Sequence, residues 1–310
     1  MKKILFSLLV LFAVSARAQV SISNPKEKFS ISATVDGVAN TDYTWDTKHG
    51  DNIAEGNMTH GMNVKVKSNV NLVSGLAGTI SVAPFYNFST TQLQTTWNGA
   101  PMFDIPDEHH NYGVTVSALL NIMLGSKEHG KPISFLASTA PNFSEHGYEN
   151  MSGVFGTMIH LIRKPDTYLA VGAIYLYGSL SWPLYPLIIY RHDFDNHWSV
   201  SMMELNDYLY YKVTPKIKFA LGTELVSDKI YFRPKNEQLP QKALYSLLSE
   251  RVGLYANWQT TKEMSMELSA GANLPIWGRV RESGHRHVYM KLHDDVKPYV
   301  QMKVSYSIKK

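Results

Sequence analysis

Apolar and polar residues alternate along most of this chain, and the alternation is clearest in residues 62–72. The apolar members of this segment are Met62, Val64, Val66, Val70 and Leu72. The polar members between them are Asn63, Lys65, Lys67, Asn69 and Asn71. Successive side chains of a strand point to opposite faces, so one face is apolar and the other polar. The segment is also as long as a tilted strand that crosses a bilayer, roughly 9–11 residues. It therefore predicts a membrane-crossing β-strand.

Similar segments recur along the chain at fairly even spacing. The predicted strands are 29–35, 62–72, 80–88, 112–120, 133–139, 153–162, 168–177, 184–191, 198–204, 208–213, 217–223, 245–258, 264–272 and 300–308. They number fourteen, and twelve is the alternative because 205–207 is a very short link for an outer loop. An even number is expected for a barrel made of one chain.

Short and long connections roughly alternate between these strands. The short ones are rich in the turn residues Gly, Pro, Asp and Asn, and they are 74–78, 125–132, 164–167, 193–196, 214–216 and 259–262. The long ones are 36–61, 89–111, 140–152, 227–244 and 275–297. Membrane barrels have short periplasmic turns and longer extracellular loops. The sequence thus predicts an all-β fold, a single transmembrane antiparallel β-barrel in the outer membrane.

The distribution of charge assigns the two faces of the strands. A basic residue on the lipid face near the middle of the bilayer would cost about 2–4 kcal/mol, so the charged faces should line the lumen. The predicted lumen-lining residues are Lys65, Lys67, Asn69, Asn71, Lys218, Glu267, Gln301 and Lys303. The predicted lipid-facing residues are Met62, Val64, Val66, Val70, Leu72, Val300, Met302, Val304 and Tyr306. A secreted or periplasmic β-sandwich that binds a ligand is the alternative, since its polar faces would meet solvent.

The amino-terminal residues predict a secretory signal. Lys2 and Lys3 precede an apolar run, and the small residues around Arg17 supply a cleavage pattern. We expect residues 1–18 to be removed and residues 19–310 to form one barrel domain. The mature chain is then close to neutral, because the signal carries three of the 30 basic residues and none of the 26 acidic ones. Export and the lack of a basic block argue against a nucleic-acid partner.

One longer segment resembles a known family. The residues "WPLYPLIIYRHDFDNHWSVSMMELNDYLYYKVTPKIKFALGTELVSDKIYF" contain a strand that ends at Tyr190, a polar turn, a strand opened by Trp198 and a turn at Pro215. This pattern resembles uncharacterised outer-membrane β-barrel proteins of Gram-negative bacteria, a family defined only by a domain of unknown function. The resemblance implies an outer-membrane barrel and brings no catalytic residue. Many such barrels end in an aromatic residue that the barrel-assembly machinery recognises, whereas here Tyr306 precedes Ile308 and two lysines.

Two groups of residues are candidates for chemistry. His109 and His110 follow two acids in one loop, and a second loop holds His285, His287 and His293 with Asp294 and Asp295. Neither of these two histidine clusters has the helical i, i+4 spacing of a metalloenzyme. We therefore expect solvated loop residues, no metal and no cofactor. The absence of cysteine excludes disulfides and thiolate sites.

The second group is Ser144-Glu145-His146, the nearest local candidate for a hydrolase that acts on lipid. It lacks the motifs of such enzymes, and we expect no catalytic residues. The leading hypothesis is a barrel that passes small solutes passively or has a structural or surface role. If the protein has only a structural or surface role, we expect its lumen to be packed and closed. A lipid-acting barrel enzyme is the alternative, and outer-membrane lipid and the assembly machinery are the expected partners.

Overall fold

The structure is a computed structural model, and it describes most of the chain after residue 26. The described residues are 27–47, 52–59, 61–75, 77–97, 100–105, 108–124, 131–177, 184–203, 206–234, 239–285, 287–293 and 295–309. No helix among them is long and apolar enough to cross a membrane. The predicted signal, residues 1–18, lies outside this range and stays a prediction.

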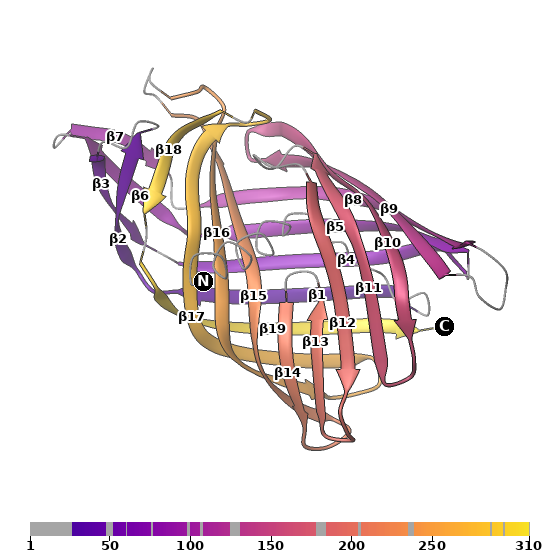
Figure 1. The fold of residues 1–310 in the computed structure, drawn as a ribbon. Helices are drawn as coiled ribbons and strands as arrows, with labels where there is room; N and C mark the ends of the chain where they lie inside the picture. Colours follow the sequence, from indigo (N-terminus) through magenta and orange to yellow (C-terminus); the bar gives the residue numbers. More distant parts are fainter. Residues whose placement is uncertain are drawn as a thin grey trace, which may run out of the picture.

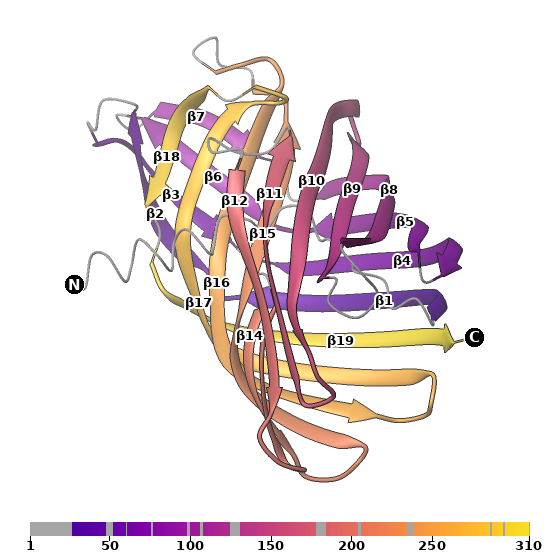
Figure 2. The same cartoon turned by 45° about the vertical axis from the view of Figure 1, so that its right-hand side comes forward.

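Fourteen of the described strands close into one antiparallel barrel (Figure 1, Figure 2). In the order in which they pair around the ring, they are β1 (Glu27–Val38), β4 (Met62–Gly75), β5 (Gly78–Ser89), β8 (His109–Leu124), β9 (Lys131–Ser144), β10 (Gly147–Arg163), β11 (Thr167–Tyr177), β12 (Leu184–Asp193), β13 (Trp198–Met203), β14 (Asn206–Lys212), β15 (Ile217–Phe232), β16 (Ala243–Gln259), β17 (Met264–Glu282) and β19 (Lys297–Lys309). The last strand, β19, pairs with β1 and closes the ring. The all-β barrel of fourteen strands is therefore confirmed, and the alternative of twelve is wrong.

Short turns gather at one end of the barrel, which we call the turn end; the opposite end is the loop end. The connections 164–166, 194–197, 213–216 and 260–263 lie at the turn end. One predicted long link is wrong, because residues 140–152 form the end of β9, a turn at Glu145 and His146, and the start of β10. Their polar residues satisfy one another within the strand pair: Asn142 Nδ2 donates to Asn150 Oδ1 at 2.9 Å. Buried amides can thus extend a ladder where polarity alone suggests a loop.

Three of the other predicted long links contain strands of their own. These are β2 (Thr41–Thr47), β3 (Asn52–Thr59), β6 (Gln92–Trp97), β7 (Ala100–Ile105) and β18 (Val288–His293). They continue the pairing from β17 through β18, β2, β3 and β6 to β7. Figure 1 shows them as an extension of the barrel sheet at the loop end, beside β17.

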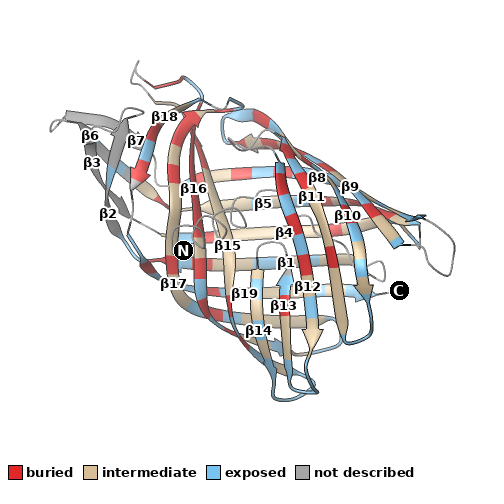
Figure 3. Ribbon diagram, in the orientation of Figure 1, coloured by how far each residue is buried: buried red, intermediate tan, exposed pale blue. Residues whose placement is uncertain are grey.

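The barrel wall is uneven around β13 and β14, because both strands are short. This hairpin pairs with β12 only over Ile189–Asp193 and with β15 only over Lys218–Glu224. Beyond these points the hairpin no longer connects β12 to β15. There Trp277 of β17 packs against a buried apolar cluster on β10, β11 and β12. A second buried apolar cluster lies toward the loop end of β16 and β17, where buried residues are dense (Figure 3). The loop-end part of β15, beyond Glu224, lines the barrel interior.

A row of glycines crosses the wall next to the interior. Gly222, Gly253 and Gly271 are paired in register on β15, β16 and β17, and the row ends on Tyr208 and Tyr299. The missing side chains leave room for aromatic rings. The ring centroids of Tyr208 and Tyr255 are 5.0 Å apart, edge to face, and the hydroxyls of Tyr255 and Tyr299 are 3.2 Å apart.

Gly253→Ala should destabilise the barrel by about 1–3 kcal/mol, as overpacking of a filled core does. The added Cβ would collide with the Ala270 carbonyl oxygen and lie 2.6 Å from the Tyr299 hydroxyl. Gly37→Ala is the matched control, since nothing lies within 4 Å of its Cβ position. Urea unfolding of both variants in lipid vesicles measures the difference, and equal stability would contradict the packing described.

Candidate functional site

A cavity of about 660 Å³ lies inside the barrel. Its lining comes from β1, β4, β5, β8, β9, β10, β13, β14, β15, β16 and β19, so it is enclosed by strands from most of the ring. Hydroxyl, amide and charged side chains dominate this lining. The alternation of the strands explains this, because their polar positions face the interior and their apolar positions face outward.

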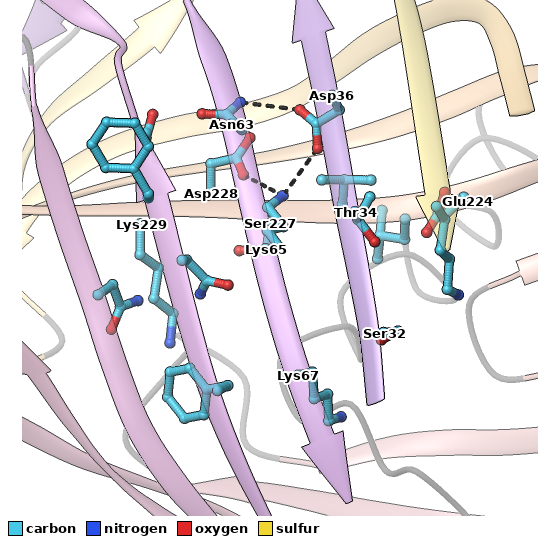
Figure 4. A pocket seen from close by; sticks show the side chains of 18 of the residues that line it. Ser32, Thr34, Asp36, Asn63, Lys65, Lys67, Glu224, Ser227, Asp228 and Lys229 are labelled. Carbon is cyan, nitrogen blue, oxygen red and sulfur yellow. Dashed lines mark hydrogen bonds and ion pairs between the residues drawn. The ribbon is translucent and has the colours of Figure 1, made fainter. Parts of the chain in front are cut away.

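An ion-paired cluster links strands on different sides of this cavity. Asp36 accepts hydrogen bonds from Arg251 Nη2 at 3.1 Å and from Asn63 Nδ2 at 3.1 Å. Lys65 Nζ lies 2.9 Å from Asp228 Oδ1 and 3.6 Å from Asp36 Oδ2. Figure 4 shows Lys65 between the two carboxylates. The cluster therefore joins the paired strands β1 and β4 to the paired strands β15 and β16 through side chains that meet inside the barrel.

The two most buried members of this cluster are Asp36, at 2% exposure, and Arg251, at 1%. Arg251 also donates to Gln301 Oε1 and lies over the ring of Tyr299 at 4.9 Å. A buried guanidinium needs such compensation, since a buried charge without partners is very costly. Two acids and two bases make the cluster neutral as a set.

The structure places the sequence-predicted lumen residues as follows. Five of them line the cavity, namely Lys65, Lys67, Asn69, Gln301 and Lys303. Asn71 accepts a hydrogen bond from Asn69 Nδ2 and donates to the Glu27 carbonyl oxygen, toward the turn end. Glu267 accepts a hydrogen bond from Asn257 Nδ2 at 3.4 Å, and Lys218 is exposed near the start of β15, at the turn end.

The predicted lipid-facing residues occupy the alternate positions of β4 and β19. Val300 and Leu72 are the most exposed of them, at 64% and 62%. Met62, Met302 and Tyr306 are also exposed, whereas Val64, Val66, Val70 and Val304 are half-buried. Contact of this set with lipid stays a prediction.

Among the described side chains, the histidines that the sequence places in two loops do not gather into a metal site, and His109 and His110 stand at the start of β8 and not in a loop. His109 is buried, and its Nε2 lies 3.1 Å from the Thr91 carbonyl oxygen. His110 points elsewhere, with Nδ1 2.8 Å from the Tyr86 hydroxyl. In the second loop the His287 ring packs edge to face on Tyr289, and Asp294 lies outside the described residues. Across the described part of the chain, no group of three or more His, Asp or Glu side chains is arranged to hold a metal ion.

The Ser144-Glu145-His146 segment does not form a hydrolase pair. Ser144 donates to Glu149 Oε1 at 2.6 Å, and Arg233 Nη2 binds the same oxygen at 2.6 Å. The imidazole of His146 lies instead 3.6 Å from Glu145 Oε1. Partial burial acts to raise the pKa of Glu145, but the nearby His109 imidazole, 3.9 Å away, and backbone N–H groups outweigh it and lower this pKa to about 2. These contacts tie the β9–β10 turn to the loop end of the barrel.

A closed, even-numbered antiparallel barrel with an apolar exterior and a polar interior is the architecture of an outer-membrane β-barrel protein. In such a fold each backbone polar group has a partner strand, so the ring can sit in hydrocarbon. The outer membrane is accordingly where this chain resides.

No protein-family model matches the chain, and no curated protein sequence matches it. Among solved structures it is similar to an outer-membrane channel from Pseudomonas putida F1, at 10% identity and a TM-score of 0.42, covering 94% of this chain and 100% of that one. It is also similar to the toluene transporter TodX from Pseudomonas putida, at 11% identity and a TM-score of 0.38, covering 94% of this chain and 93% of that one. A third is the outer-membrane protease OmpT from Escherichia coli, at 7% identity and a TM-score of 0.36, covering 93% and 99%. Likeness at this level identifies no ligand or activity.

Asp36→Asn should lower the free energy of unfolding by about 3–5 kcal/mol, because it leaves the buried Arg251 charge without its carboxylate partner. Urea unfolding in vesicles measures this loss. Asp166→Asn, in an exposed turn, is the control and should change stability by less than about 0.5 kcal/mol. Equal effects of the two substitutions would contradict a structural role for the ion-paired cluster.

Proposed function

We propose that this protein is a passive channel for small hydrophilic solutes. The observation that carries the proposal is the polar cavity of about 660 Å³ inside a closed barrel. Pockets that bind small molecules usually have volumes between about 300 and 1,000 Å³, and this cavity falls within that range. A purely structural barrel would gain more from an apolar, packed interior than from a set of charges that must each be compensated.

The ion-paired cluster sets the narrow point of this path. Lys65 extends from β4 to Asp228 on β15, two strands that are not neighbours in the ring. A side-chain bridge across a lumen restricts passage to solutes that fit beside it. Small solutes, outer-membrane lipid and the barrel-assembly machinery are the partners in this proposal.

Purified protein, folded in planar lipid bilayers, should give discrete single-channel currents. Lys65→Ser should raise the conductance, because it removes the side chain that spans the interior. Lys212→Ser, at the turn end of β14, is the control and should leave the conductance unchanged.

Folding of each sample is checked by its faster migration on a gel before boiling than after. Folded wild-type protein and folded Lys65→Ser that both pass no current would overturn the proposal and favour a closed structural barrel.

A further inference from the structure

Two lysines stand on either side of β1 inside the cavity, closer to the turn end than the Asp36–Arg251 pair: Lys303 by one inward-facing position and Lys67 by two. Lys67 on β4 is in register with Ser32, and Lys303 on β19 is in register with Thr34. All four residues line the same cavity. Figure 4 shows Lys67, Ser32 and Thr34 on adjacent strands of this wall. Two ammonium groups and two hydroxyls thus share one surface.

The charged residues of the cavity lining carry a small net positive charge. Lys65 and Arg251 are matched by Asp36 and Asp228, as described above. The other charged residues of the lining are Lys67, Lys229, Lys303 and Glu224. Glu267 adds one more acid, since it lies opposite Lys303 in the pairing of β17 with β19. Three lysines therefore stand against two glutamates outside the neutral cluster, and the lining as a whole favours an anion.

The hydroxyl and amide side chains around the lysines indicate which other functional groups a bound anion would have. Ser30, Ser68 and Asn69 line the cavity beside Ser32 and Thr34. Hydroxyl and amide groups both donate and accept hydrogen bonds, so they match a solute that bears hydroxyls of its own. Ammonium groups donate only, and they favour a carboxylate.

We propose that the wall formed by Lys67, Lys303, Ser32 and Thr34 binds small hydroxylated organic anions, the class to which sugar acids belong. The carboxylate lies between the two lysines, and the hydroxyls of the solute bind the serine and threonine side chains. This inference rests on the proposed channel function, and it names the class of solute that the channel carries. The site lies beside the narrow point at Lys65, so solutes meet it within the path.

Calorimetric titration of the detergent-solubilised full chain tests the site without any current. The probes are gluconate, which carries both a carboxylate and hydroxyls, and sorbitol, which carries hydroxyls alone. Gluconate should bind at least tenfold more tightly than sorbitol. A variant with both Lys67→Gln and Lys303→Gln should lose at least tenfold in gluconate affinity.

Two further variants make the titration decisive. Lys164→Gln with Lys212→Gln removes two lysines at the turn end, away from the cavity, and should keep wild-type affinity. Lys67→Arg with Lys303→Arg keeps both charges and should retain most of the binding. Equal affinity for gluconate and sorbitol, or unchanged gluconate affinity in the folded Lys67→Gln, Lys303→Gln variant, would overturn the site.

The reversal potential of the channel in a gradient of potassium gluconate separates this inference from the function on which it rests. A reversal potential that shows anion preference, and that shifts toward cations in the Lys67→Gln, Lys303→Gln variant, supports both. Gluconate binding without any current would overturn the channel and leave the site standing. Current with cation preference and without gluconate binding would overturn the site and leave the channel standing.

Discussion

The need of every strand for a hydrogen-bonded neighbour on each side governs this structure. A bilayer offers no water to an open sheet edge, so each unpaired backbone group there would cost several kcal/mol. The pairing of β19 with β1, from Glu27 opposite Lys309 to Val38 opposite Tyr299, closes the ring. Once the ring is closed, alternation sends most of the polar strand residues inward and most of the apolar ones outward. The polar cavity, its ion pairs and the apolar exterior all follow from that closure.

Closure also buries several charged side chains inside the barrel, and each of them needs an opposite charge nearby. Asp36, Lys65, Asp228 and Arg251 come from four strands, and each charge has an opposite charge within 4 Å. The glycine row on β15, β16 and β17 gives the tyrosines room, and Tyr299 in turn supports the Arg251 guanidinium. Packing and charge compensation therefore depend on one another along this wall. Neither fills the cavity beside Lys67 and Lys303.

Much of this architecture was predictable from the sequence. Alternation in segments such as 62–72 locates the strands, because one apolar and one polar face is a local property of the chain. The link 140–152 was not predictable, since the pairing of Asn142 with Asn150 depends on a neighbour that local pattern does not reveal. The strands within residues 36–61 and 89–111 were missed for a similar reason, because β2, β3, β6 and β7 pair chiefly with one another beyond the barrel.

The site was predictable only in part. Lys65, Lys67 and Lys303 stand in clear alternating segments, and their place in the cavity follows from that. Asp36 lies one residue beyond the predicted first strand, and Arg251 lies within a weakly alternating one, so neither was identified. Their partnership joins residues 215 positions apart in the chain. Such a contact depends on the order and register of the strands, which the sequence pattern leaves open.

The orientation of the two faces is tested most directly by labelling single cysteines, which report only their own position because the chain has none. Val66→Cys with Lys67→Cys on β4, and Val300→Cys with Lys303→Cys on β19, form two pairs of opposite faces. Each is made alone, labelled with an environment-sensitive fluorophore and folded into vesicles. Quenching by spin-labelled lipid at positions 66 and 300, and by aqueous iodide at positions 67 and 303, is the predicted result. The reverse pattern, or iodide quenching at all four positions, would contradict a barrel that spans the membrane with its lysines inside.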